Sequence, residues 1–332
     1  MASPNNLFDA LIVGAGPAGL AAALALGRVL RTAVVFDTGV FRNASSQHMH
    51  TVPTWDHQSP AAYREQAARE IRERYPGIIS FANSGAVSVK KVDNGTKVSL
   101  VDDRGRTWAG KKIILATGVT DKFPNIQGYA QAWGKTIFHC LFCHGYEQRN
   151  SERAGMLIAD KAVLDAEVDV AVHFSHLGKQ FAKQISIFLD GNKKLLEDPR
   201  VKKLGDQGFE ILPQAIIKLE QEEGDEPTWI DVHLDDGSTE RLSFLVHKPQ
   251  TVHTSDLHAQ LGVELTAGGD IKVKPPFGET TVEGVFAAGD CAVPLKQVAW
   301  AVATGASAGS GVSFQLVNSD VEQTPHVADA NQ

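Results

Sequence analysis

The chain has 332 residues, of which 43% are hydrophobic and 21% charged, and a formal net charge of −7. The length predicts two domains, and the acidic balance argues against nucleic acids and anionic membranes as partners, because both require a basic face. No apolar run reaches the roughly 20 residues of a membrane span, and the first residues lack a signal-peptide pattern, so we expect a cytoplasmic protein with no membrane partner.

The first predicted elements are a short apolar strand and a helix, joined by a glycine-rich turn. The strand covers residues 8–13, the turn reads Gly14-Ala-Gly-Pro-Ala-Gly19, and an Ala/Leu-rich helix covers residues 20–30. The first glycine permits a tight turn, the second lets the backbone approach a pyrophosphate, and the third lets the helix pack on the strand. A second strand, residues 33–36, ends at Asp37, an acid placed to accept ribose hydroxyls. The order of these features predicts a dinucleotide site.

Two later segments favour FAD as the dinucleotide. Residues 112–118 are a strand ending in Ala-Thr-Gly, and residues 282–290 are a strand ending in Gly-Asp, after which residues 295–300 open a helix of small residues. Between the first turn and these segments, residues 61–75 predict a helix and residues 81–102 a hairpin. We interpret the helix and the hairpin as scaffold.

A Cys-x-x-Cys pair, Cys140 and Cys143, carries the redox chemistry that the sequence indicates. Three cysteines are too few for a disulfide framework, and in a reducing compartment such a pair is redox-active or metal-binding. A zinc site from His139, His144 and the two cysteines is disfavoured because adjacent positions crowd a tetrahedron, so we expect no metal. Cys291 is expected to be a buried small hydrophobic residue.

These motifs, in this order, resemble those of the low-molecular-weight thioredoxin reductases of the pyridine-nucleotide-disulfide reductase family. The resemblance implies an α/β fold with two Rossmann-like domains, in which an NADPH-type domain interrupts the FAD domain, and a homodimer. The expected parts are an FAD domain of residues 1–121 and 247–320, an inserted module of residues 122–246 with the Cys-x-x-Cys, and a flexible tail of residues 321–332. The positions implied to bind FAD are Gly14, Ala15, Gly16, Pro17, Ala18, Gly19, Asp37, Thr38, Arg42, Gln47, His50, Val87, Ala116, Thr117, Gly118, Gly289, Asp290, Lys296, Gln297 and Val298.

The inserted module departs from this family where its NADPH fingerprint should lie. A strand at residues 154–158 runs into Ala159-Asp-Lys-Ala-Val163, which contains no glycine, and Asp160 would repel a pyrophosphate. The next strand, residues 184–190, is not followed by the paired arginines that would hold a 2′-phosphate. We interpret this as loss of the nucleotide site; a divergent site that still admits a nicotinamide nucleotide is the alternative.

Without the NADPH fingerprint, the chain resembles fungal dithiol oxidases of epipolythiodioxopiperazine pathways and holomycin-type bacterial oxidases. The segments that carry this resemblance are Cys-Leu-Phe-Cys, Gln47-His-Met-His50 and Trp55-Asp-His57. That resemblance implies FAD, molecular oxygen and a small-molecule dithiol that leaves as a disulfide, with hydrogen peroxide as the second product. An NADPH-dependent thioredoxin reductase and a non-catalytic flavoprotein that binds a toxic dithiol are the alternatives.

The same resemblance implies the roles of the residues around the sulfur pair. Cys143 is expected to lie nearer the flavin, and Cys140 to be the outer sulfur that exchanges with substrate. His144 stands where thioredoxin reductases carry an acid, and because its ordinary pKa of about 6.5 suits proton transfer at neutral pH, it is the candidate general base. His144 as a helix cap or a solvent-facing residue is the alternative.

Overall fold

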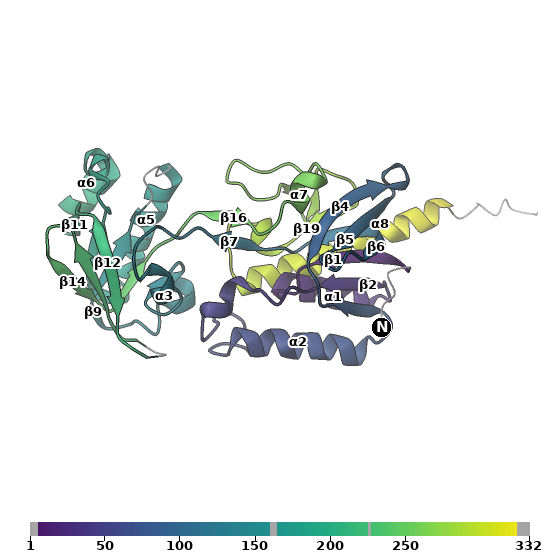
Figure 1. Ribbon diagram of the computed structural model, residues 1–332, viewed down its shortest axis with the longest axis horizontal. Helices are drawn as coiled ribbons and strands as arrows, with labels where there is room; N and C mark the ends of the chain where they lie inside the picture. The colour runs from purple at the N-terminus through teal and green to yellow at the C-terminus, as the bar shows by residue number, and fades with distance from the viewer. Residues whose placement is uncertain (1–5, 160–164, 225–226, 324–332) are drawn as a thin grey trace, which may run out of the picture. The chain divides into compact units, whose positions relative to one another are not determined.

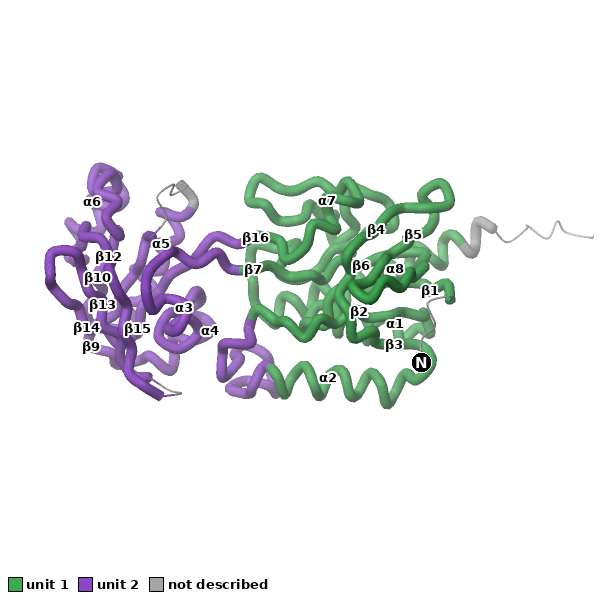
Figure 2. Tube along the Cα trace, viewed as in Figure 1, with its two compact units in different colours: residues 1–42, 61–120, 252–332 green, residues 43–60, 121–251 purple. Residues whose placement is uncertain are grey.

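The computed structural model describes residues 6–159, 165–224 and 227–323, so Asp160 and the turn in which it was predicted to lie fall outside the described residues. The chain folds into two compact units, which Figure 2 distinguishes by colour. The first unit comprises residues 1–42, 61–120 and 252–332, and the second comprises residues 43–60 and 121–251. Residues 43–60 thus group with the second unit, and the domain boundaries expected from sequence stay a prediction.

The first unit is built on a nine-stranded sheet whose central strands are parallel (Figure 1). Along the sheet the order is β17-β18-β19-β6-β1-β2-β3, and β4 and β5 extend from β6 as an antiparallel hairpin. The strands are β1 (Leu7–Val13), β2 (Ala33–Phe36), β3 (Ile79–Ala82), β4 (Ala86–Val92), β5 (Lys97–Asp102), β6 (Thr107–Leu115), β17 (Val273–Lys274), β18 (Glu279–Thr280) and β19 (Val285–Ala287). In β1 every residue after the first is buried, as expected for a parallel strand that is covered on both faces.

Helices α1 (Pro17–Arg28) and α8 (Val298–Gln323) pack together in this unit because small residues let their backbones approach closely. A Cβ atom on Gly305 of α8 would lie 2.1 Å from the carbonyl oxygen of Ala18 in α1. The remaining helical elements are α2 (Pro60–Arg74), α7 (Leu257–Gln260), η1 (Arg42–Ser45), η2 (Asp93–Gly95) and η4 (Gly289–Cys291). Strands β7 (Val119–Asp121) and β16 (Thr251–His253) pair where the chain crosses between the units.

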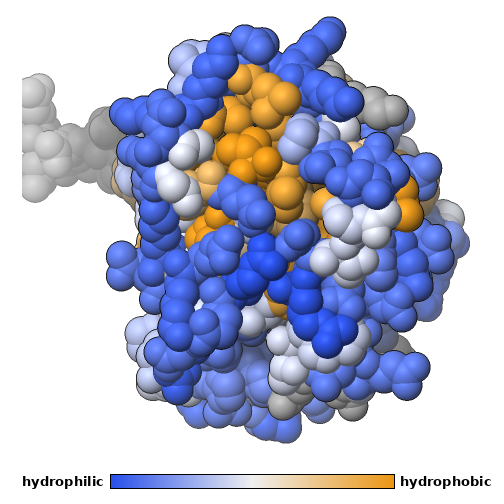
Figure 3. All heavy atoms as spheres, turned by 90° about the vertical axis from the view of Figure 1, so that its left-hand side faces the viewer, coloured by the Kyte–Doolittle hydropathy of each residue, from blue (hydrophilic) through white to orange (hydrophobic). Residues whose placement is uncertain are grey.

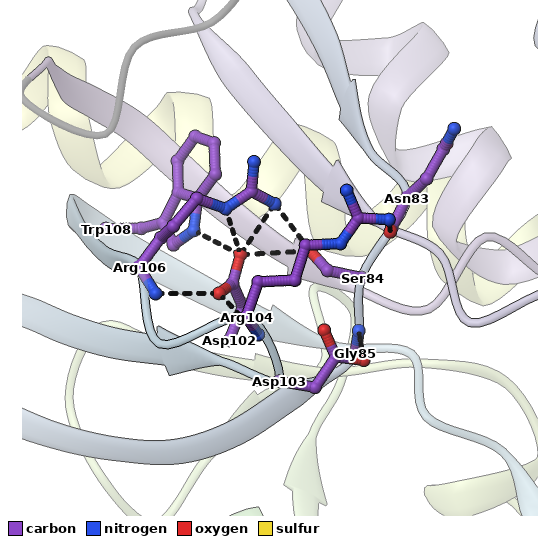
Figure 4. Close-up of polar contacts among 8 residues, drawn as sticks. All are labelled: Asn83, Ser84, Gly85, Asp102, Asp103, Arg104, Arg106 and Trp108. Carbon is purple, nitrogen blue, oxygen red and sulfur yellow. Dashed lines mark hydrogen bonds and ion pairs between the residues drawn. The ribbon is translucent and has the colours of Figure 1, made fainter.

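A buried carboxylate ties the β5–β6 turn together (Figure 4). Asp102 is 2% exposed and accepts hydrogen bonds from the Trp108 indole at 3.0 Å, the Arg106 Nε at 2.8 Å and the Ser84 hydroxyl at 3.0 Å. These donors outweigh the desolvation that opposes them and hold the pKa of Asp102 well below its ordinary value. The carboxylate therefore fixes the turn as an ionised group.

The second unit contains a five-stranded parallel sheet in the order β11-β10-β9-β15-β8 and a separate antiparallel sheet of β12, β13 and β14. Its strands are β8 (Ile137–Phe138), β9 (Ser151–Leu157), β10 (Ala182–Phe188), β11 (Glu210–Leu212), β12 (Ile216–Gln221), β13 (Ile230–Leu234), β14 (Thr239–Leu242) and β15 (Phe244–Val246). Its helical elements are α3 (Tyr129–Ala132), α4 (Leu141–His144), α5 (Asp165–Gly178), η3 (Lys193–Glu197) and α6 (Pro199–Asp206). Figure 3 views this unit from the side of α6 and β14, where hydrophilic side chains surround an apolar patch. The α/β fold expected from sequence is confirmed.

Candidate active site

The residues expected to bind the dinucleotide in the first unit gather at one edge of its sheet. Strands β1, β2, β6 and β19 are parallel and end at Val13, Phe36, Leu115 and Ala287. The glycine turn, Asp37, the Ala-Thr-Gly segment and the Gly-Asp segment each follow one of these ends. Ligands of open parallel sheets bind outside the carboxyl ends of the strands, so this edge is the candidate cofactor site.

The glycine turn has the geometry of a cradle for a phosphate. Gly14 has φ +111°, and a Cβ there would lie 2.2 Å from the carbonyl oxygen of Ala116, whereas a Cβ on Gly19 would lie 1.8 Å from the carbonyl oxygen of Gly14. Around Gly16, by contrast, an added Cβ would meet nothing within 4 Å. Gly14 and Gly19 are therefore needed for packing, while Gly16 borders open space at the start of α1, where backbone N–H groups favour an anion. The residues present fit the pyrophosphate of FAD.

Charged side chains complete this edge. Arg42 Nη1 lies 3.0 Å from the Asp290 carboxylate, and Lys296 Nζ donates to the Asp290 carbonyl oxygen at 2.9 Å and to Asp270 Oδ1 at 2.9 Å. Asp37 accepts the backbone N–H of Gly39 at 2.8 Å. These contacts hold both acids of the expected flavin site at the same edge as the glycine turn.

The structure does not bring every expected cofactor residue into the first unit. Gln47 and His50 group with the second unit, and Val87, on the β4 hairpin strand, is 56% exposed. Cys291 is buried with its thiol donating to the carbonyl oxygens of Leu115 and Ala288, each at 3.3 Å, and burial raises the pKa of that thiol.

In the second unit Cys140 and Cys143 form a disulfide across the first turn of α4. Cys140 is the N-cap residue, and its carbonyl oxygen accepts the backbone N–H groups of Cys143 and His144, each at 3.2 Å. Cys140 is 8% exposed, whereas Cys143 lines a surface hollow. Cys143, and not Cys140, is among the residues that line this hollow. The role expected for Cys140, exchange with the substrate, stays a prediction.

His144 lies in a confined position beside this disulfide. Its ring stacks on Phe138, with centroids 4.6 Å apart, and its centroid lies 6.3 Å from that of His50. Burial, reinforced by the imidazoles of His50 and His48, lowers the pKa of His144 to about 4. The ring is therefore neutral at pH 7 and accepts a proton less readily than an exposed histidine.

His50, Thr51 and Asp56 line the same hollow as Cys143, a contact that no local sequence pattern reports residue by residue. The hollow is lined by His50, Thr51, Asp56, Phe142, Cys143, Tyr146 and Glu147. The only sequence signal was the resemblance that singled out the stretches at residues 47–50 and 55–57. Tyr129, Trp133 and Phe138, aromatic residues close to the sulfur pair in sequence, are instead at most 7% exposed and belong to the core of the unit.

The fold and the disulfide define a disulfide oxidoreductase of the flavoprotein type, and comparison with known proteins agrees. Residues 8–305 match the family described as pyridine nucleotide-disulphide oxidoreductase. "Thioredoxin reductase sirT" of Leptosphaeria maculans is 61% identical over 97% of this chain and 98% of that protein. "Thioredoxin reductase aclD" of Aspergillus oryzae is 41% identical over 95% of this chain and 98% of that protein.

The crystal structure of HlmI superposes with a TM-score of 0.86 at 28% identity, covering 97% of this chain and 96% of that one. An oxidoreductase from Agrobacterium tumefaciens superposes with a TM-score of 0.81 at 29% identity, covering 94% of this chain and 99% of that one. The chain therefore belongs to the pyridine nucleotide-disulphide oxidoreductase family and is a flavin-dependent thiol oxidoreductase, as the sequence predicted. Among the described residues, no helix combines the length and the apolar character needed to span a bilayer.

Proposed function

We propose that this protein is an FAD-dependent dithiol oxidase that closes a disulfide in a small molecule and uses molecular oxygen as the electron acceptor. The observation that supports this most is the Cys140–Cys143 disulfide beside a solvent-open hollow, in a chain whose second unit lacks the glycines of a nucleotide loop. The protein has the parts for exchange with an external thiol, but not the fingerprint for taking electrons from NADPH.

The exchange steps follow from the chemistry of the two sulfurs. One thiolate of the substrate attacks the enzyme disulfide, which forms a mixed disulfide and releases one cysteine as a thiolate. The second substrate thiol then displaces the enzyme sulfur, so the substrate leaves as a disulfide and Cys140 and Cys143 are both reduced. Two protons leave the substrate, and His144, neutral at pH 7, is the candidate group to accept one of them.

FAD bound at this edge would supply the two-electron redox chemistry that links the reduced cysteines to oxygen, with hydrogen peroxide as the product. Its pyrophosphate would lie against Gly16, in the turn that Gly14 and Gly19 shape. Asp37 would bind its ribose and Asp290 its ribityl chain, with Arg42 paired to Asp290. The net reaction converts one dithiol and one oxygen molecule into one disulfide and one peroxide, so atoms and electrons balance.

The names of the relatives favour a second candidate, an NADPH-dependent thioredoxin reductase. The two candidates differ in what reduces the flavin. Anaerobic mixing of the purified protein with NADPH should leave the visible flavin band unchanged, whereas a small dithiol should bleach it. Rapid bleaching by NADPH alone would reject the oxidase in favour of the reductase.

The Cys143→Ser variant tests for catalysis against simple binding of a dithiol. An oxidase loses turnover and oxygen uptake in this variant, because the remaining sulfur cannot form the enzyme disulfide. A flavoprotein that only binds dithiols would retain its effect. Trapping of a mixed disulfide in Cys140→Ser or in Cys143→Ser, read by mass spectrometry, identifies the sulfur that the substrate attacks.

A further inference from the structure

Two histidines and a glutamate converge at the hollow beside the sulfur pair. His50 Nε2 lies 3.7 Å from Glu147 Oε1, and His57 Nδ1 lies 3.9 Å from the same oxygen. One donor atom from each of these three side chains lies within 4.8 Å of the other two. His50 and His57 come from a segment that is far in sequence from Glu147, so the fold and not the local sequence brings them together.

From this geometry we propose that His50, His57 and Glu147 form a binding site for a divalent cation of the zinc class. Zinc bonds of about 2.0–2.2 Å place two donors of a tetrahedral site about 3.3–3.6 Å apart. The separations of 3.7 and 3.9 Å from Glu147 need shifts of only a few tenths of an ångström, and the donor atoms of His50 and His57 lie within 4.8 Å of each other. Two imidazoles and one carboxylate are a donor set that zinc accepts, and three protein ligands leave a fourth position for another ligand.

The surroundings of His50 support this site independently. Its other ring nitrogen, Nδ1, lies 3.6 Å from Asp56 Oδ1, and a carboxylate behind a ligating histidine fixes the ring and raises its basicity. Asp56 Oδ1 is itself held by the backbone N–H of Thr51 at 2.9 Å. The His50 side chain is only 10% exposed, so its orientation is set by packing.

The backbone places the two histidines opposite each other. Met49 N–H donates to the carbonyl oxygen of Gln58 at 2.8 Å, and His57 N–H donates to the carbonyl oxygen of Met49 at 2.9 Å. The His57 ring also stacks on His48 at 4.2 Å between centroids. The loop is therefore closed before any cation arrives, which reduces the entropy lost on binding. As a ligand, His50 would take a role other than the flavin contact expected from sequence.

The role of the cation rests on the proposed function. Cys143 and Glu147 line the same hollow, so a substrate thiol that approaches the disulfide also approaches the fourth coordination position. A thiol bound to zinc is deprotonated, and a thiolate is the form that attacks a disulfide. The cation would thus hold the substrate thiol as a thiolate next to its target.

Zinc binding to the oxidised flavoprotein, stripped with a chelator, tests the site without any turnover. Calorimetric titration with Zn²⁺ should give one site per chain, and His57→Ala and Glu147→Gln should each weaken binding at least about tenfold. The matched control is Glu220→Gln, because Glu220 lies 3.5 Å from His233 but belongs to no group of three potential metal ligands among the residues that the structure describes. This control should bind zinc like the unchanged protein.

Three results would overturn the site. They are an absence of saturable zinc binding, an affinity that neither His57→Ala nor Glu147→Gln changes, and binding that disappears when both Cys140 and Cys143 are replaced by serine. Circular dichroism and flavin content of each variant verify that it is folded.

A second experiment tests whether the cation holds the substrate thiol. Zinc should lower the KM for a dithiol at least about threefold in the unchanged protein and not in Glu147→Gln. An unchanged KM would reject the role, while failure of dithiol oxidation itself would reject the proposed function and leave the titration as an independent result.

Discussion

Gly16→Ala should separate cofactor binding from folding. Gly16 has φ −71° and ψ −179°, which alanine adopts without strain, and its added Cβ would meet nothing within 4 Å. Because Gly16 is the N-cap residue, its replacement by alanine lowers the free energy of unfolding by a few tenths of a kcal/mol to about 1 kcal/mol. The lower flexibility of the unfolded chain raises the free energy of unfolding by about 0.4–1 kcal/mol and offsets this loss. The free energy of unfolding of the apoprotein should therefore change by less than about 0.5 kcal/mol. FAD affinity should fall at least about tenfold, or 1.4 kcal/mol, because the methyl group occupies the space through which the pyrophosphate approaches.

Gly19→Ala is the matched comparison. Its Cβ would lie 1.8 Å from the carbonyl oxygen of Gly14, so α1 must move away from the turn, at a cost of about 1–3 kcal/mol to the apoprotein. Urea unfolding of the apoproteins, followed by circular dichroism, measures the free energy of unfolding, and titration with FAD measures the cofactor affinity. A Gly16→Ala apoprotein destabilised by more than about 1 kcal/mol, or one that binds FAD with undiminished affinity, would refute this account of the glycine turn.

Two further variants test buried groups. Asp102→Asn should lower the free energy of unfolding by about 3 kcal/mol, since it leaves the Arg106 guanidinium without its carboxylate. Asp103 is an exposed neighbour, so Asp103→Asn should change the free energy of unfolding by less than about 0.5 kcal/mol. Equal effects of the two substitutions in urea unfolding would contradict this reasoning. Burial lowers the pKa of His247 to about 4, so the stability that its neutral form provides is fully present above about pH 6.5 and is lost as the pH falls toward 4. His247→Gln should therefore reduce the loss of unfolding free energy between pH 7 and pH 4 by about 2–3 kcal/mol, and an unchanged pH dependence would show that His247 is not buried in its neutral form.

The first unit could be predicted from sequence because its signals are local. The glycine turn, the strand before it and the acid after the next strand all lie within residues 8–37, and parallel strands place such turns at one edge of the sheet. The expected strands at residues 8–13 and 33–36 correspond closely to β1 and β2. Each of these patterns predicts one element from residues that are neighbours in the sequence, so the prediction does not depend on the rest of the chain.

The hollow beside the disulfide could not be predicted in the same way. Its walls come from residues 50–56 and 142–147, and no pattern within either segment reports the contact between them. The residue type also fails to distinguish a pocket from a core, since Tyr129 and Trp133 are buried while Phe142 is 63% exposed. Periodicity indicates that a face is apolar, but only the tertiary fold decides what covers it.

The pKa of His144 could not be predicted from the sequence either, because it depends on what surrounds the ring in the fold. A pH profile of dithiol oxidation tests it. The sequence supplies an imidazole with an ordinary pKa of about 6.5, whereas burial, reinforced by the imidazoles of His50 and His48, lowers its pKa to about 4. His144 is then neutral throughout the range above pH 5.5, so ionisation of thiols and not of His144 should shape the rate of dithiol oxidation there. His144→Asn should lower turnover at every pH without moving the acid limb of the profile. Loss of an inflection near pH 6.5 in the variant would show that His144 titrates as an exposed histidine and does not occupy a confined position.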